Sequence, residues 1–151
     1  MRLPVPLLRL AYRSAYTALR GYWFVRRPEV AGVKCVLTDR DRVLLVQHTY
    51  GDRGWDLPGG SIKRGELPID AARREMGEEL GVEIDDWMPL GRLLANMHHR
   101  RDTMHCFQAD LHGSQIRMDH GELAAVRLFP RRELPPDLAT HVRRILARTA
   151  G

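Results

Sequence analysis

The stretch GSIKRGELPIDAARREMGEELGV, residues 60–82, decides how this chain folds. Its second half carries apolar residues at helical spacing, which predicts a helix with one face turned inward. Pro68 suits the first position of that helix, and Gly81 suits a left-handed end. We therefore expect a helix over residues 68–80, whose inward stripe consists of Ile69, Ala72, Met76 and Leu80.

Three carboxylates crowd the last turns of this helix. Glu75, Glu78 and Glu79 are spaced i, i+3 and i+4, so they share one face and repel each other by roughly 0.2–0.5 kcal/mol per pair. The helix dipole also disfavours negative charge near the carboxyl end. A divalent cation would relieve both effects, and oxygen ligands without cysteine or histidine suit Mg²⁺ or Mn²⁺. Taken alone, the helix also fits an ordinary solvated face.

The residues before the helix decide between these interpretations. The whole stretch fills the pattern G-x5-E-x7-R-E-U-x-E-E-x-G-U, where U is apolar, with fixed positions at Gly60, Glu66, Arg74, Glu75, Glu78, Glu79 and Gly81. At average residue usage, a chance match to these fixed positions has a frequency of ~10⁻⁸ per starting point. The pattern resembles the signature of the Nudix hydrolases, and the preceding WDLPG, residues 55–59, resembles its usual lead-in.

The resemblance covers roughly residues 30–150 and implies a Nudix-type α/β/α sandwich. The order of short strands and helices favours the same α/β class, with helices on both faces of a mixed sheet. We expect a hairpin of strands 30–38 and 42–48, a short strand at 61–62, and strands at 89–97, 103–111 and 124–129. The predicted domain, residues 29–151, is completed by a turn over 98–102, a polar loop over 112–122 and a last helix from about residue 135.

Residues 1–28 form an N-terminal extension in this interpretation. Apolar and aromatic residues recur there at helical spacing, with arginines between them, so we predict an amphipathic helix from about Pro6 to Arg20. Such a helix fits packing on the domain or on a second copy in a homodimer, and it also fits contact with an anionic membrane surface. A mitochondrial presequence and a secretory signal are less favoured.

The composition describes a globular protein of 151 residues with a formal charge of +5. A basic surface favours an anionic partner, either a phosphate-bearing metabolite or a nucleic acid. Cys35 and Cys106 lie in apolar runs, so we expect buried free thiols in a reducing compartment. No apolar run reaches the length of about 20 residues that a membrane span needs, and we expect a cytoplasmic protein.

The resemblance implies roles for five residues of the stretch. Glu75, Glu78 and Glu79 would bind the metal ion, with the backbone carbonyl of Gly60 as a further ligand, since glycine permits close approach. Arg74 would orient the glutamates through charge-assisted hydrogen bonds. The resemblance implies Mg²⁺ or Mn²⁺ and no other cofactor.

The remaining charged residues near the signature leave alternatives open. Glu66 fits either a structural ion pair or a metal contact. The general base differs among family members, so Glu79 and Glu122, which precedes the last strand, are both candidates, and Glu122 also fits a metal ligand. Lys63 and Arg64 stand beside the signature and are candidates for contacts with the diphosphate.

Other substrate contacts have to come from outside the signature. Arg100 and Arg101, in the predicted turn, fit either bidentate phosphate contacts or a solvated basic turn. Tyr50 and Trp55 fit stacking on a base, and Trp55 fits the core equally well. None of these residues identifies the group attached to the diphosphate.

The expected function is Mg²⁺-dependent cleavage of the pyrophosphate bond in a nucleoside diphosphate linked to another moiety. The expected partner is a small-molecule nucleotide. Nucleic acid is disfavoured, because the chain has no platform of aromatic residues for stacking single-stranded RNA. The alternative is a catalytically silent Nudix-like binding module whose basic N-terminal helix contacts a partner or a membrane. The intact signature favours the enzyme.

Overall fold

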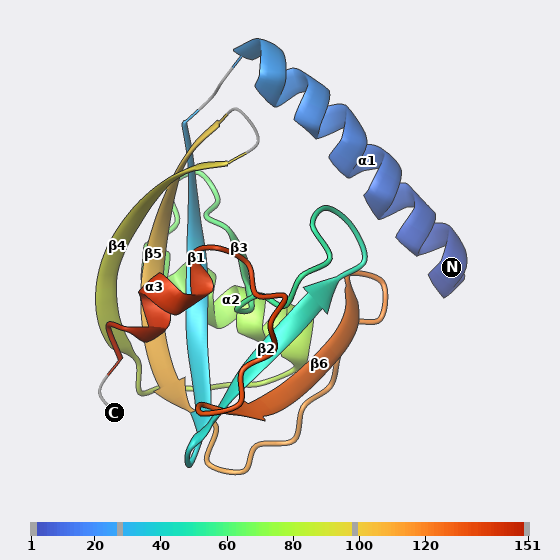
Figure 1. Cartoon of the computed structure of the whole chain (residues 1–151). Helices are drawn as coiled ribbons and strands as arrows, with labels where there is room; N and C mark the ends of the chain where they lie inside the picture. The colour runs from blue at the N-terminus through green and yellow to red at the C-terminus, as the bar shows by residue number, and fades with distance from the viewer. Residues whose placement is uncertain (1–2, 27–28, 98–99, 150–151) are drawn as a thin grey trace.

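The computed structural model describes residues 3–26, 29–97 and 100–149. Its helices are α1 (Val5–Arg26), α2 (Pro68–Leu80) and α3 (Val142–Leu146). Its strands are β1 (Glu29–Asp39), β2 (Arg42–His48), β3 (Gly59–Ser61), β4 (Met88–Met97), β5 (Arg100–Asp110) and β6 (Leu123–Pro130). The strands form one mixed sheet in the order β4-β5-β1-β2-β6, with β3 paired to β1 (Figure 1).

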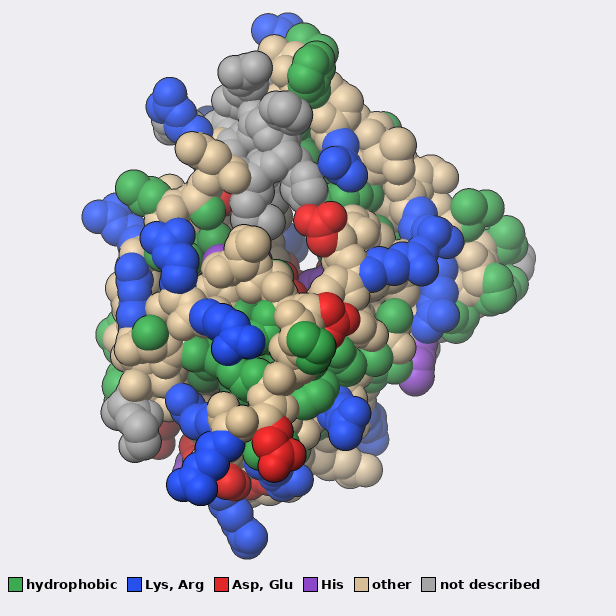
Figure 2. All heavy atoms as spheres, in the orientation of Figure 1, with side chains coloured by type: hydrophobic (Ala, Val, Ile, Leu, Met, Phe, Trp, Pro, Cys, Tyr) green, Lys and Arg blue, Asp and Glu red, His purple; other side chains and the backbone are tan. Residues whose placement is uncertain are grey.

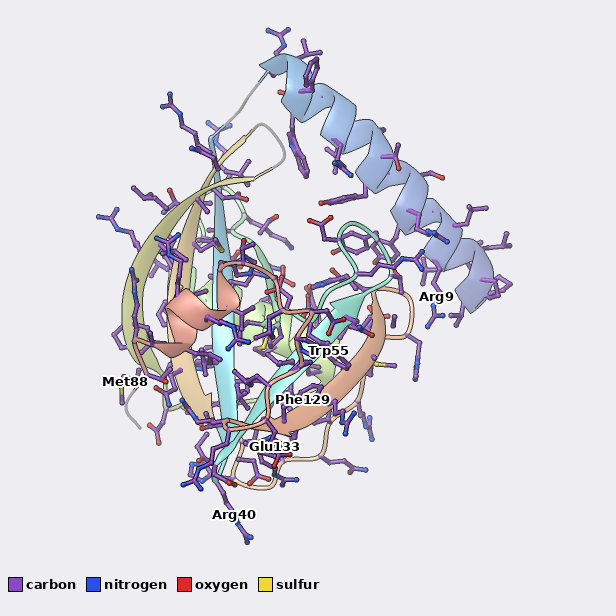
Figure 3. The ribbon with its side chains drawn as sticks, viewed as in Figure 1. Arg9, Arg40, Trp55, Met88, Phe129 and Glu133 are labelled. Atoms are coloured by element: carbon purple, nitrogen blue, oxygen red, sulfur yellow. The ribbon has the colours of Figure 1, made fainter. Side chains whose placement is uncertain are left out.

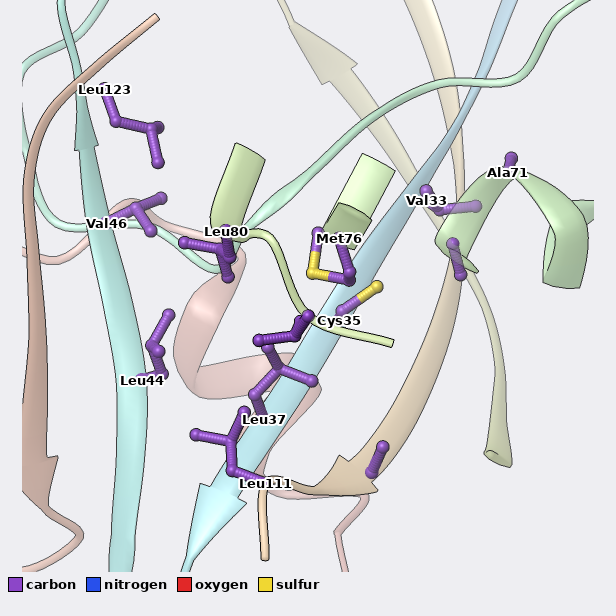
Figure 4. Close-up of a cluster of buried hydrophobic side chains, with 13 residues drawn as sticks. Val33, Cys35, Leu37, Leu44, Val46, Ala71, Met76, Leu80, Leu111 and Leu123 are labelled. Carbon is purple, nitrogen blue, oxygen red and sulfur yellow. The ribbon is translucent and has the colours of Figure 1, made fainter. Parts of the chain in front are cut away.

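Helices α2 and α3 cover opposite faces of this sheet, which confirms the predicted α/β/α arrangement (Figure 1). Alternate residues of β1 explain the two layers, since successive side chains of a strand point to opposite faces. Cys35 and Leu37 pack with Met76 of α2 (Figure 4), whereas Val36 packs with Ile145 of α3. Strand β1 pairs in parallel with β5 and antiparallel with β2 and β3.

The sheet is split on one side of β1. Strands β1 and β2 pair only next to their turn, at Thr38–Val43 and Asp39–Arg42, and separate beyond it. The segment 55–61 fills the wedge between them, because Asp56 bridges Val46 and β3 pairs with β1. A Cβ at Gly59 would lie 1.9 Å from the carbonyl oxygen of Val33, so only glycine fits there. The wedge brings β3 directly against α2.

Helix α2 has the predicted bounds. Leu67 precedes it with an extended backbone and no side-chain cap, Pro68 begins it, and Asp70 lies in its first turn. Gly81 ends it at φ 64°, and its N–H donates to the carbonyl oxygen of Gly77. Glycine reaches this left-handed conformation without the steric cost that a Cβ brings. The glutamates of the last turns are therefore held on a helix with a sharply defined end.

Three predicted boundaries in the domain are wrong. The short strand covers Gly59–Ser61 and not residues 61–62, because Gly59 and Gly60 pair with Lys34 and Val33 of β1. The last helix begins at Val142 and not near residue 135, because the backbone of Trp55 exchanges hydrogen bonds with Asp137 and Ala139 and keeps that segment extended. Strand β5 begins at Arg100, inside the predicted turn, because Arg100 pairs with Met97 of β4 and Arg101 pairs with Glu29 of β1. The predicted turn residues 98 and 99 lie outside the described part of the chain.

The N-terminal helix is present and longer than predicted, since α1 ends at Arg26. It lies along the outside of the domain, opposite the open side of the wedge (Figure 1). Its Trp23 is buried, whereas Leu7 and Leu10 are exposed. No helix in the described ranges is long and apolar enough to cross a membrane. Both cysteines are buried free thiols, as predicted.

Candidate functional site

Arg74 is the hub of the acidic cluster on α2. Its guanidinium donates to both oxygens of Glu66, at 2.8 and 2.9 Å, and to the carbonyl oxygen of Ser61 at 2.9 Å. It also donates to Glu75 at 2.9 Å and to Glu78 at 3.2 Å. One arginine thus ties the loop, β3 and the helix together, and the hydrogen bonds to Glu66 and then Glu75 raise its pKa.

Glu66 contacts Arg74 from the loop before α2. Besides Arg74, it accepts a hydrogen bond from the backbone N–H of Lys63 at 3.0 Å. The hydrogen bonds from Arg74, followed by that from Lys63, lower the pKa of Glu66 to about 2. Both of its oxygens already have partners, so its position fits the structural ion pair better than a metal contact.

Glu75 and Glu79 face inward, and Glu78 faces outward. Glu75 and Glu79 are buried, whereas the Glu78 side chain is 56% exposed. The solvated-face interpretation therefore holds for Glu78 alone. A Cβ at Gly60 would lie 2.3 Å from the Glu75 Cδ, so the Glu75 carboxylate occupies the space that a side chain at position 60 would need.

Glu79 is the most unusual carboxylate of the cluster. It is 0% exposed, and among the described residues neither of its oxygens has a hydrogen-bond partner. Burial raises its pKa well above the ordinary range, and the charges of Glu122 and Glu75 raise it further. Burying a charge without a partner is costly, so such a group points to a missing ligand or a bound proton.

Glu122 reaches the cluster from the polar loop before β6. The backbone N–H of Thr49 donates to the Glu122 carbonyl at 2.9 Å, and the Tyr50 hydroxyl donates to its Oε1 at 3.0 Å. The same loop is fixed to the end of α2, because the N–H of Asp119 donates to the Glu79 carbonyl. Burial raises the pKa of Glu122, and so does the charge of Glu75. The two candidate bases, Glu79 and Glu122, are therefore brought together.

The donor set fits a hard divalent cation. Every candidate side-chain ligand supplies carboxylate oxygens, and Glu79 offers two that have no donor. No three Asp, Glu, His or Cys side chains in the described ranges stand in a ready-made metal cluster, and one nitrogen of Arg74 holds both Glu75 and Glu78. Arg74 thus fixes the directions of Glu75 and Glu78 beside Glu79.

A cavity of about 750 Å³ adjoins the cluster. Residues 59–61 of β3 line one side of it, and α1 lines the opposite side through Tyr12, Tyr16 and Trp23. Figure 2 shows the molecule hollowed beneath α1. Gly60 of β3 thus lies between the acidic cluster and this cavity.

The two aromatic residues predicted to contact the substrate, Tyr50 and Trp55, lie in different parts of the structure. Tyr50 lines the cavity. Trp55 instead packs edge-on against Phe129, with ring centroids 4.8 Å apart, in the core beneath α3 (Figure 3). Trp55 is therefore a core residue. Of these two aromatic residues, only Tyr50 is placed where it can contact a ligand.

The predicted basic contacts are not among the described residues that line the cavity. Lys63 and Arg64 are exposed on the loop before α2. Arg101 is exposed in β5, and the side chain of Arg100 lies outside the described part of the structure. The structure does not bring these cations together at the cavity wall.

Sequence reasoning missed an ionic cluster on the cavity floor. The Lys34 Nζ donates to Asp56 Oδ2 at 2.7 Å, and the His141 Nε2 lies 2.6 Å from Asp56 Oδ1. Burial alone would raise the pKa of Asp56, but the charge of Lys34 and the hydrogen bond of His141 hold it well below its usual range. These residues come from three distant parts of the chain. The only sign of the cluster in the sequence is Lys34, a lysine inside an apolar strand.

Replacing Asp56 with Asn should lower the free energy of unfolding by about 3–5 kcal/mol, because the half-buried Lys34 loses its counter-charge. The folded pKa of Asp56 lies below its unfolded value of about 3.9, so its contribution is complete above that pH and is lost as the pH falls further. Urea unfolding at pH 7 and at pH 3 measures both effects. Asp70→Asn, which removes an exposed pair with Arg73, is the control and should cost under about 1 kcal/mol. Equal midpoints for both variants would contradict the prediction.

The fold, with the acidic cluster on α2 beside the glycines of β3, defines the class of protein. The model of the NUDIX domain matches residues 28–149, so the chain belongs to the NUDIX family. Among solved structures, it is similar to a MutT NUDIX hydrolase from Burkholderia pseudomallei, with a TM-score of 0.74 and 21% identity over 81% of this chain and 98% of that one. It is also similar to the NUDIX domain of Shewanella oneidensis NrtR complexed with ADP ribose, with a TM-score of 0.69 and 20% identity over 80% and 85%.

Curated relatives match part of the chain. An RNA pyrophosphohydrolase of Bartonella clarridgeiae is 33% identical over 112 residues, which are 64% of this chain and 57% of that protein. A diphosphoinositol polyphosphate phosphohydrolase 3-beta of Bos taurus is 43% identical over 77 residues, which are 50% of this chain and 44% of that protein. The chain thus spans about half the length of these relatives, whose names point to different substrates.

Proposed function

We propose that this protein is a Mg²⁺-dependent hydrolase that cleaves the pyrophosphate bond of a nucleoside diphosphate linked to another moiety. One observation carries the proposal: the buried carboxylate of Glu79, which has no hydrogen-bond partner among the described residues, lies beside an acidic cluster that Arg74 orients. A diphosphate is itself anionic, so it needs a cation between it and these carboxylates. The family and the adjoining cavity support the same conclusion.

Glu75, Glu78 and Glu79 would hold the cation, with the Gly60 carbonyl as a further ligand. When bound, Mg²⁺ neutralises charge on phosphate oxygens and makes water a better nucleophile. Mn²⁺ suits the same oxygen donors. Arg74 is a positioning residue, because its hydrogen bonds fix the directions of Glu75 and Glu78.

Either Glu79 or Glu122 accepts the proton of the attacking water. Both have a raised pKa, which suits proton transfer near neutral pH better than an ordinary carboxylate does. Glu122 also accepts a hydrogen bond from the Tyr50 hydroxyl, so the proton affinity of Glu122 depends on that hydrogen bond. The relative loss of activity in Glu79→Gln and Glu122→Gln assigns the base.

The substrate side of the proposal rests on the cavity beside Gly60. Tyr50 lines it and is proposed to contact the substrate, whereas Trp55 belongs to the core. Lys63, Arg64 and Arg101 are left as outer contacts for phosphate groups. A small-molecule nucleotide is favoured over RNA, because the cavity is closed on one side by α1.

The test is product release from a panel of nucleoside diphosphate derivatives with Mg²⁺, with Glu78→Gln as the variant. Glu78 is exposed, so this variant should fold normally, yet kcat/KM should fall at least about 100-fold, since a metal ligand supplies several kcal/mol of charge stabilisation. Glu133→Gln, at the far end of the molecule, is the matched control (Figure 3). Unchanged turnover in Glu78→Gln would remove the metal-site assignment.

The rival is a silent binding module that uses α1 for contact with a partner or a membrane. Its support is the outer face of α1, which exposes apolar side chains at Leu7, Leu10 and Phe24 beside arginines. The same panel decides between them. If no member is hydrolysed while a nucleotide or an anionic vesicle binds tightly, the binding module replaces the enzyme.

A further inference from the structure

Exposed apolar side chains are concentrated on helix α1 and the residues just before it. Of the 11 large hydrophobic side chains that are exposed among the described residues, eight lie between Leu3 and Val25. Val25 is the most exposed of them, at 76%. Single exposed apolar residues are ordinary on a protein surface, but their concentration on one helix marks an interaction surface.

Most of these side chains lie on the side of α1 that faces away from the domain. At 3.6 residues per turn, Leu7 and Val25 are five full turns apart and share a face, and Leu10 and Phe24 lie close beside it. Trp23, about half a turn before Val25, points the other way and is buried. We call Leu7, Leu10, Phe24 and Val25 the outer face of α1.

The opposite side of α1 is fastened to the domain. The Arg9 Nε donates to the backbone carbonyl of His120 at 2.9 Å (Figure 3). The rings of Tyr12 and Tyr50 are stacked, with centroids 5.9 Å apart. The helix is thus held against the domain by one side, and a partner can bind the outer face without displacing it.

The positive charge of the whole chain comes from the segment that carries this helix. Residues 1–28 contain six of the 24 arginines and lysines and none of the 19 aspartates and glutamates. Residues 29–151 therefore contain 18 basic and 19 acidic residues, so their formal charge is −1, against +5 for the chain. A partner that this helix attracts by charge is anionic.

Arginines border the outer face on both flanks. At about 100° per residue, Arg13 and Arg20 fall on one flank, between the outer face and the domain, and Arg26 falls on the other. All three are exposed. Figure 2 shows arginine side chains along α1 and hydrophobic side chains at both of its ends. This is the pattern of a helix that lies in a membrane interface, where apolar side chains enter the acyl boundary and arginines reach the headgroups.

The same features disfavour two other partners. A second copy of α1 would bring the arginines of two helices together, and residues 1–28 supply no acidic residue to separate them. A nucleic acid would pair with the arginines through its phosphates, but it would leave the apolar side chains of the outer face without an apolar partner. A bilayer that contains anionic lipids satisfies both the charge and the apolar face.

We propose that the outer face of α1 is a docking surface for an anionic lipid bilayer, with the helix lying along the membrane surface. No helix in the described ranges is long and apolar enough to cross a membrane, so this is contact with one surface. The inference goes beyond the proposed hydrolysis and does not depend on it. Docking holds the domain at the membrane, while the contacts of Arg9 and Tyr12 keep α1 beside the candidate site.

The test is sedimentation of the full chain with vesicles of two compositions. Vesicles of phosphatidylcholine with about 30 mol% phosphatidylglycerol should bind the protein at least about tenfold more tightly than phosphatidylcholine alone, because each arginine near an anionic surface contributes about fivefold. Binding should weaken as NaCl is added, since salt screens exposed charges. Equal binding to both kinds of vesicle, or none, would overturn the inference.

Two double variants separate the apolar contribution from the charge. Leu7→Gln with Leu10→Gln should weaken binding to the anionic vesicles at least about tenfold, because two apolar side chains no longer enter the interface. Arg13→Gln with Arg20→Gln should weaken it about 25-fold and abolish most of its salt dependence. All four side chains are exposed, so both variants should melt at the temperature of the wild type.

Matched controls carry the same changes far from α1. Met88→Gln removes an apolar side chain that is 53% exposed, and Arg40→Gln removes an exposed arginine (Figure 3). Both should bind the anionic vesicles as the wild type does. Losses in these controls as large as those in the double variants would contradict docking through α1.

Turnover distinguishes this inference from the proposed function. Glu78→Gln should lose turnover and still bind the vesicles, whereas Leu7→Gln with Leu10→Gln should lose vesicle binding and keep turnover of a soluble substrate. Hydrolysis without vesicle binding leaves the function standing and overturns the inference, and vesicle binding without hydrolysis does the reverse. If the wild type ignores vesicles but forms a dimer that the double leucine variant dissociates, the outer face binds a second copy and the inference is wrong.

Discussion

Glu79→Gln should abolish turnover and, at the same time, make the metal-free protein more stable. The carboxylate is fully buried, lacks hydrogen-bond partners among the described residues, and lies near the charges of Glu122 and Glu75. Removing its charge ends that repulsion, although the new amide still lacks partners. We expect a gain of about 1–2 kcal/mol, which raises the melting temperature by roughly 2–8 °C, and a fall in kcat/KM of at least about 100-fold.

The raised pKa of Glu79 also predicts the direction in which the stability of the protein changes with pH. The folded pKa of Glu79 is raised above its unfolded value of about 4.3, so the folded protein binds more protons than the unfolded chain over the interval between them. Stability is therefore complete below the unfolded pKa and falls as the pH rises through the folded pKa. Glu75 and Glu122 act in the same direction, and Glu79→Gln should reduce this slope without removing it.

Urea unfolding in EDTA at pH 5 and pH 8 measures the slope. Wild type and the Glu133→Gln control should lose stability between these values, and Glu79→Gln should lose less. Added Mg²⁺ should stabilise wild type more at pH 8 than at pH 5, since a ligand stabilises the state that binds it. The assignment is wrong if Glu79→Gln is less stable than wild type at pH 8, or if it turns over substrate normally.

Local signals account for what the sequence predicted well. The bounds of α2 follow from Pro68 and Gly81, whose backbone preferences act within one turn of the chain. The hairpin of β1 and β2 follows from two β-branched runs around a polar turn. The candidate ligands stay a prediction, which comes from a fixed spacing on one helix and so does not depend on distant contacts.

Contacts between distant residues account for what the sequence missed. Helical spacing puts Glu75 and Glu79 beside Ala72 and Met76, but only the position of Gly60 in β3 shows why the Glu75 carboxylate fits there. The cavity floor joins Lys34 to Asp56 and His141, and no local pattern links positions so far apart. The last helix was placed too early for the same reason, because backbone hydrogen bonds to Trp55 override the helical pattern.

Gly60→Ala should remove activity by displacing the Glu75 side chain. Gly60 does not have the positive φ that would exclude alanine, but the new Cβ would lie 2.3 Å from the Glu75 Cδ and 2.4 Å from its Oε1. Glu75 must then leave the place where Arg74 holds it. We expect kcat/KM to fall at least about 100-fold, because misplaced charge stabilisation costs several kcal/mol. Loss of stability should stay within about 1–2 kcal/mol, since alanine also restricts the unfolded chain.

Gly77→Ala is the matched control on the same helix. Its Cβ would come no closer than 4.0 Å to another residue, so alanine should stabilise α2 by about 0.5–1 kcal/mol and leave turnover unchanged. A Gly60→Ala variant with wild-type activity would show that Glu75 tolerates displacement and is not needed for catalysis.

A double-mutant cycle with Glu75→Ala then separates the two roles proposed for Gly60. If Gly60→Ala acts by displacing Glu75, it should weaken Mg²⁺ binding in the wild-type background and have no further effect when Glu75 is already alanine. Calorimetric titration of Mg²⁺ measures this even where turnover is lost. Fully additive losses would instead assign the effect to the Gly60 carbonyl, because moving that oxygen weakens a ligand that does not depend on Glu75.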